Sequence, residues 1–215
     1  LPPHKTDKVS LSHLLAGHKP PDLRDCSVCL LNQLRKRQHR RGAQVDDGTG
    51  ELSGDFFGKC NTSLQSNEWG CVGVKRDSRM GFFSALPSRD SIVVKDAIEN
   101  WRVDWRRIWR FHTDDDGSFG GHVSQFLAKL HAIAQTNTGG YDSAANGIVE
   151  GRIRMIVITA RCLLAQAGCP ASMWDLACEH GNEILNRSKM PIPNQEPCEP
   201  MLVELRLANA ETADE

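Results

Sequence analysis

Aromatic residues, net charge and long hydrophobic runs are all scarce in this sequence. Aromatics make up 6% of the 215 residues, with one tyrosine, and the formal net charge is −1. No apolar run approaches the roughly 20 residues of a membrane-spanning helix, and no secretory signal pattern is visible. We therefore expect a protein that is neither membrane-embedded nor secreted, built from one ordinary domain with at most a small appendage.

The eight cysteines do not indicate a disulfide framework. Such frameworks occur in short, cysteine-dense chains, whereas Cys162, Cys169 and Cys178 lie within a helical pattern. A thiol in such a position is usually a small buried apolar group. We therefore expect a reducing compartment.

Charge is unevenly distributed in spite of its near-zero sum. Residues 1–41 carry nine Lys and Arg against three acids, and residues 195–215 carry one Arg against six acids. The basic head predicts a polyanionic partner, and the acidic tail is expected to be solvated and flexible. The densest part of the head is typical of sequence-independent phosphate contacts. Its candidate nucleic-acid-binding residues are Arg35, Lys36, Arg37, Arg40 and Arg41.

Two pairs of metal-ligand residues precede this basic cluster. His13 and His18 form one pair, and Cys26 and Cys29 form a Cys-x-x-Cys turn. Two imidazoles and two thiolates match a tetrahedral structural zinc site. Metal binding would also supply folding energy to a head with few large apolar residues. The alternative is a set of unliganded polar residues in a mobile arm, and His4 is a candidate substitute ligand.

After a polar linker at 44–50, residues 51–190 carry the pattern of an α/β domain. Three short strands in succession indicate an antiparallel meander, and helices then alternate with strands. We expect a mixed sheet of about five strands with helices on its faces, between a head at 1–43 and a tail at 191–215. The expected strands are 51–58, 71–75, 80–86, 108–113 and 133–136, and the expected helices are 91–105, 122–131, one opening at 146, and 171–186.

Three acids stand where the chain can bring them together. Asp55 lies within the first expected strand, where an ionised side chain is unfavourable unless compensated. Asp114 ends the fourth strand, and Glu150 follows it after 35 residues, in the first turn of a helix. Taken alone, Glu150 is explained as an acid favoured by the helix dipole. If the first and fourth strands are neighbours, the converging carboxylates indicate one or two divalent cations.

Together these motifs resemble the integrase region of copia-type retrotransposons, which belongs with retroviral integrases in the RNase H-like superfamily. The resemblance spans roughly residues 13–190, and Trp174 with Ala177 and Leu185-Asn-Arg187 are similar to the segment after the family's catalytic helix. The motifs that carry it are His13/His18/Cys26/Cys29, Asp55-x-x-Gly58, Thr113-Asp-Asp-Asp-Gly-Ser-Phe119 and Asn146-Gly-x-x-Glu150. The resemblance implies an RNase H-like fold with a zinc-binding head.

The resemblance also implies an activity. Asp55, Asp114 and Glu150 would be the catalytic triad of a polynucleotidyl transferase and would bind two Mg²⁺ or Mn²⁺ ions, while the head would bind one structural Zn²⁺. The implied reaction is DNA integration: water trims the element's 3′ ends, and the new 3′-hydroxyl then attacks target DNA. Further candidate DNA contacts beside the acid are Asn146, Arg152 and Arg154.

The implied partners are double-stranded DNA, further copies of the chain in a homo-oligomer, and a parent Gag-Pol-type polyprotein. A polyprotein origin agrees with a first residue that is leucine rather than methionine. The implied location is the nucleus, reached through cytoplasmic particles.

Departures from the family pattern leave alternatives open. The family usually has Asn-Gly-x-Glu-Phe after the second Asp, but this chain has Asp115-Asp-Gly-Ser-Phe119, so Asp115 and Asp116 are rival metal ligands. Lys59 stands where a proline usually follows the glycine of the first motif. One alternative is therefore a decayed or co-opted integrase fragment that binds DNA through its zinc head without catalysis. Another is an RNase H-type nuclease on the same fold.

Overall fold

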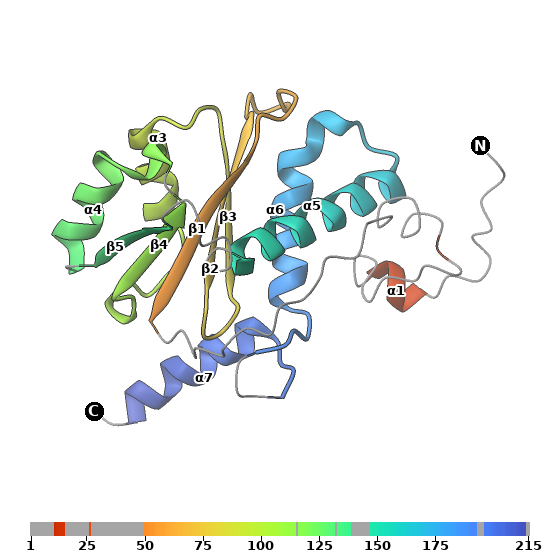
Figure 1. The fold of residues 1–215 in the computed structure, drawn as a ribbon. Coiled ribbons are helices and arrows are strands. Elements are labelled where there is room, and N and C mark those ends of the chain that lie inside the picture. Colours follow the sequence, from red (N-terminus) through yellow and green to blue (C-terminus); the bar gives the residue numbers. More distant parts are fainter. Residues whose placement is uncertain are drawn as a thin grey trace.

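A five-stranded mixed sheet organises the chain (Figure 1). The computed structural model describes residues 11–15, 26, 50–114, 116–131, 133–138, 147–192 and 196–213. The strand order is β3-β2-β1-β4-β5. The first three strands, β1 (Glu51–Gly58), β2 (Trp69–Lys75) and β3 (Gly81–Leu86), form an antiparallel meander. On its other side β1 pairs in parallel with β4 (Arg110–Asp114), which pairs in parallel with β5 (Ala134–Thr138).

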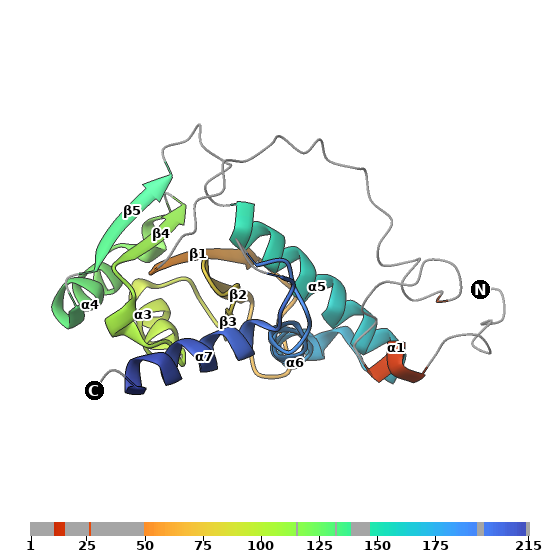
Figure 2. The same cartoon turned by 90° about the horizontal axis from the view of Figure 1, so that it is seen from below.

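Helices cover both faces of the sheet, as Figure 2 shows. On one face α3 (Ser91–Glu99) and α4 (His122–His131) enclose an aromatic-rich core around Leu52 and Phe111. On the other face α5 (Gly147–Ala167) and α6 (Trp174–Asn186) pack over Val72 and Val74. None of the described helices is long and apolar enough to span a membrane.

Strand β1 is central because successive side chains supply both cores. Leu52 is fully buried in the core under α3 and α4, and Phe56 stacks on Phe119 on the same side, with ring centroids 4.3 Å apart. Phe57 packs instead into the core under α5 and α6. Side chains alternate between faces along a strand, so Asp55 lies on the α5 face.

Several predicted elements are confirmed with their bounds, and others end elsewhere. The strand at 51–58 and the helix at 122–131 are confirmed. The helix expected over 91–105 ends at Glu99, because Trp101 leaves the helix to stack on Phe82 and to donate its indole N–H to Ser84 Oγ at 3.0 Å. The helix expected over 171–186 begins as a 3₁₀ turn, and α6 proper starts at Trp174.

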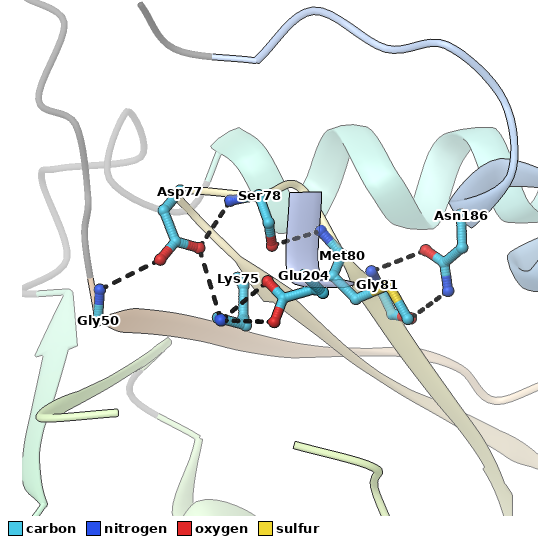
Figure 3. Close-up of polar contacts among 8 residues, drawn as sticks. All are labelled: Gly50, Lys75, Asp77, Ser78, Met80, Gly81, Asn186 and Glu204. Atoms are coloured by element: carbon cyan, nitrogen blue, oxygen red, sulfur yellow. Dashed lines mark hydrogen bonds and ion pairs between the residues drawn. The ribbon is translucent and has the colours of Figure 1, made fainter. Parts of the chain in front are cut away.

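The acidic tail differs most from expectation. The sequence predicts a solvated, flexible segment, but α7 (Pro200–Ala213) is a helix on the core. Val203 is buried, and both carboxylate oxygens of Glu204 accept hydrogen bonds from Lys75 Nζ, at 2.8 and 2.9 Å (Figure 3). Lys75 is 2% exposed. A buried ammonium requires a partner, so one acid of the tail is needed by the sheet.

Candidate active site

Two of the predicted acids lie side by side on neighbouring strands. The parallel register of β1 and β4 pairs Gly54 with Thr113, so its continuation by one residue brings Asp114 beside Asp55. Neighbouring strands are about 4.8 Å apart and paired residues point to the same face. The sequence left the adjacency of these two strands open, and the structure provides it.

Glu150 lies near the same two acids, because its charge contributes to the raised pKa of Asp55. It lies in the first turn of α5, which contacts both β1 and β2 (Figures 1 and 2). The preceding residue, Val149, is fully buried in the core under α5, whereas Glu150 is exposed. Its carboxylate is therefore accessible to a ligand from solvent.

The acids share one electrostatic environment. The pKa of Asp55 is raised from 3.8 to about 6, first by its burial and then by the negative charges of Asp114, Glu150 and Asp116. A hydrogen bond of 2.7 Å from the backbone N–H of Phe56 opposes this rise only in part. Charges that raise a carboxylate's pKa lie close to it, and such a group is suited to gain a cation.

Asp116 holds its own loop together. Its Oδ1 accepts the backbone N–H of Ser118 at 2.9 Å, which caps the 3₁₀ turn η3 (Gly117–Phe119), and its Oδ2 is paired with Arg89. Although partial burial opposes the effect, the hydrogen bonds to Ser118 and the charge of Arg89 lower the pKa of Asp116. Both oxygens are thus engaged, which weakens Asp116 as a rival ligand. Asp115 lies outside the described residues.

The acids do not form a closed metal cage. Within the described parts of the chain, no three His, Cys, Asp or Glu side chains are grouped closely enough to hold an ion. Three like charges repel one another at this range, so they are not expected to close up without a cation. Carboxylate oxygens are nevertheless the donors that Mg²⁺ and Mn²⁺ prefer, and burial together with the neighbouring negative charges raises the pKa of Asp55.

The zinc prediction falls mostly outside the described residues. His13 lies in the short helix α1 (Leu11–Leu15) and is 8% exposed, and Cys26 is 4% exposed. His18, Cys29 and His4 lie outside the described residues, as do the basic residues at 35–37 and 40–41.

Arg152 is not a DNA contact, so that prediction is wrong. Its side chain is 3% exposed and turns into the protein, where it donates hydrogen bonds to Asn182 and Asn186 of α6. Helical geometry explains the error: Arg152 is about 200° from Glu150 around α5, on the opposite side of the helix. Arg154 is half-buried, and Asn146 lies outside the described residues.

A small polar pocket beside the acids was not anticipated from the sequence. It has a volume of about 230 Å³ and lies between the loop of Asp116 and the end of β5, lined there by Gln135 and Asn137. Asn137 Oδ1 accepts a hydrogen bond of 3.1 Å from Thr113, next to Asp114. The only sequence signal is that β5 is polar along most of its length, as in Ala134-Gln-Thr-Asn-Thr138.

Comparison with known proteins identifies the fold. No family model and no curated protein matches the sequence. Among solved structures the chain is similar to the catalytic core domain of BIV integrase, with a TM-score of 0.56 and 18% identity, over 77% of this chain and 99% of that domain. The mixed five-stranded sheet flanked by helices matches an integrase core of the RNase H-like type.

Proposed function

We propose that this chain is the catalytic core of a DNA integrase, a polynucleotidyl transferase that requires Mg²⁺ or Mn²⁺. One observation supports the proposal: in an integrase-like fold, the pKa of Asp55 is raised to about 6, first by burial and then by the negative charges of Asp114, Glu150 and Asp116. Structural acids of the same chain are bonded to cations or amide donors instead, as Glu51 is to Arg76.

In this proposal Asp55, Asp114 and Glu150 would hold two divalent ions beside the scissile phosphodiester. When bound, the ions polarise the phosphate and favour the ionised form of the attacking hydroxyl. Water, or a DNA 3′-hydroxyl, then forms a bond to phosphorus while the bond to the leaving 3′-oxygen breaks. Asp116 and Arg89 steady the loop after Asp114.

Nicking of supercoiled plasmid with Mn²⁺ tests the proposal without knowledge of the element's ends. We expect the wild-type chain to nick the plasmid and to join a 3′-hydroxyl oligonucleotide to it. Glu150→Gln should abolish both reactions with an unchanged circular dichroism spectrum. The matched control is Glu99→Gln, an exposed helical glutamate on the opposite face of the sheet. Full nicking by Glu150→Gln would overturn the assignment.

A second candidate is a non-catalytic, zinc-dependent DNA-binding fragment. It is favoured by the lack of a closed metal cage among the described residues and by the burial of His13 and Cys26. Such a protein would shift a labelled duplex in a chelator-sensitive way while leaving plasmid intact with Mn²⁺. Cleavage of an RNA–DNA hybrid without joining would instead indicate the RNase H-type nuclease.

A further inference from the structure

Arg152 is the most deeply buried arginine beside the candidate active site. It lies two residues after Glu150 on α5 and is 3% exposed. Its Nε donates to Asn182 Oδ1 at 3.1 Å, and its Nη2 donates to Asn182 Oδ1 at 2.7 Å, to Asn182 O at 3.1 Å and to Asn186 Oδ1. Nη1 lies 3.5 Å from Met190 Sδ. The guanidinium fork is therefore held by α6 through four hydrogen bonds to oxygen.

The same two asparagines bind the edge strand of the sheet. The side-chain amide of Asn186 donates to Gly81 O at 2.9 Å, and Gly81 N–H donates to Asn186 Oδ1 at 2.9 Å (Figure 3). The side-chain amide of Asn182 also donates to Gly81 O, at 2.9 Å. A Cβ at position 81 would lie 2.4 Å from the guanidinium of Arg152, so a larger residue there would displace the arginine. The result is a closed polar cluster that joins α5, α6 and β3.

The partners of Arg152 in this cluster are neutral. Burial lowers the pKa of Arg152 to about 9, and only the charge of Glu183 acts in the opposite direction. A buried cation of this kind is a poor source of stability, since an apolar side chain of similar volume often packs as well. The planar guanidinium instead fixes the orientation of the side chain, because its donors fit the two asparagines in one orientation only.

The fixed orientation of the Arg152 guanidinium sets the rotation of α5 about its axis. At about 100° per residue, Glu150 points roughly opposite to Arg152, and the two side chains are indeed exposed and buried respectively. Glycines at 147 and 151 weaken the first turn of the helix. The start of α5 is therefore held by the non-directional apolar contacts of Val149, Ile148 and Ile153 and by the directional hydrogen bonds of Arg152.

We propose that Arg152 is a positioning residue: its cluster with Asn182, Asn186 and Gly81 sets the roll of α5 and thereby holds Glu150 toward Asp55 and Asp114. The inference rests on the proposed function, because it concerns the geometry of the same three acids. Arg152 itself touches neither metal nor DNA.

Mn²⁺ titration of the full chain tests this role through two readouts, thermal stabilisation by Mn²⁺ and plasmid nicking. In Arg152→Met we expect about tenfold more Mn²⁺ at half-saturation in both, with a lower kcat and an unchanged KM for plasmid. Arg152→Lys restores one part of the fork and should fall between wild type and Arg152→Met. Val94→Ala, a truncation of a fully buried side chain on α3, is the control that lowers stability without moving the Mn²⁺ half-saturation.

Asn186→Ala removes one acceptor while it keeps the arginine, and it decides the matter if Arg152→Met does not fold. We expect it to shift the Mn²⁺ half-saturation in the same direction, by about threefold. Half-saturation within twofold of wild type in every folded cluster variant would overturn the positioning role. If the wild-type chain neither gains stability with Mn²⁺ nor nicks plasmid, the proposed function itself fails, which is a distinct result.

Discussion

Strand β1 carries two acids on the same face, four residues apart, in opposite surroundings. Glu51 is 2% exposed and accepts hydrogen bonds from Arg76 Nη1 at 2.6 Å and Arg110 Nη1 at 3.2 Å. Asp55 is half-buried at the centre of the strand, and the charges around it are the acids Asp114, Glu150 and Asp116. The two acids differ in what surrounds them: at Glu51 the protein supplies the cation, whereas at Asp55, in the proposed function, a bound metal ion supplies it.

The largest effect on activity is expected from loss of the Asp55 carboxylate. Asp55→Asn should lower Mn²⁺-dependent nicking by about 1000-fold or more, equivalent to about 4 kcal/mol of transition-state stabilisation. Its stability without metal should be equal to or above that of wild type, because the change relieves repulsion between carboxylates. Plasmid nicking and thermal unfolding on the same preparation measure both. If Asp55→Asn lost both activity and folding, Asp55 would be a structural acid like Glu51, which would contradict the comparison.

The opposite outcome, a loss of stability with metal binding unchanged, is expected for Glu51. Glu51→Gln should lower the free energy of unfolding by about 3 kcal/mol, because two arginines lose a buried anionic partner. The remaining folded protein should keep its Mn²⁺ half-saturation. Urea unfolding followed by circular dichroism gives the first quantity and thermal-shift titration gives the second. A stable Glu51→Gln protein with weakened Mn²⁺ binding would erase the distinction between the two acids.

The raised pKa of Asp55 predicts that the stability of the folded protein depends on pH. Because the folded-state pKa is raised to about 6, protonation stabilises the folded state, fully below the unfolded value of about 3.8 and no longer above about pH 6. Between about pH 4 and pH 7 the metal-free wild type should therefore lose on the order of 2 kcal/mol relative to Asp55→Asn, allowing for partial exposure. Unfolding of both proteins at several pH values measures the difference, and parallel curves would refute it.

The smallest effect is expected for Asp116, and it tests whether Asp116 rather than Asp55 binds the metal. Its oxygens are bonded to Ser118 and Arg89, so Asp116→Asn should cost about 1 kcal/mol or less as a weakened cap and surface ion pair. We expect nicking within about threefold of wild type, because the carboxylate is engaged in the loop. A loss as large as that of Asp55→Asn would assign Asp116 to the metal instead.

The sequence predicted those features that local pattern determines. The alternation of apolar residues in Glu51–Gly58 and the helical spacing of His122–His131 were sufficient for the bounds of those elements. The candidate acids Asp55, Asp114 and Glu150 could be named because acids are rare at a strand centre, a strand end and the edge of an apolar helical stripe. Their convergence, however, needed the parallel pairing of β1 with β4, which no local pattern encodes.

The features that the sequence misjudged depend on partners distant in the chain. Arg152 was predicted to be a surface cation. No residue near it in the sequence indicates that it is bonded to Asn182 and Asn186, which lie 30 and 34 residues later. Glu204 was assigned to a loose tail, although it is bonded to the buried ammonium of Lys75 on β2. In both cases a charged side chain is satisfied by tertiary contacts, which composition and periodicity do not report.

Crystals of the protein grown with Mn²⁺, with diffraction data collected for its anomalous signal, test the central claim most directly. The account predicts an anomalous peak about 2.1–2.2 Å from carboxylate oxygens of both Asp55 and Asp114, with Glu150 turned toward the same ion or a second one. A peak confined to Asp116, or no peak near Asp55 at saturating Mn²⁺, would contradict it.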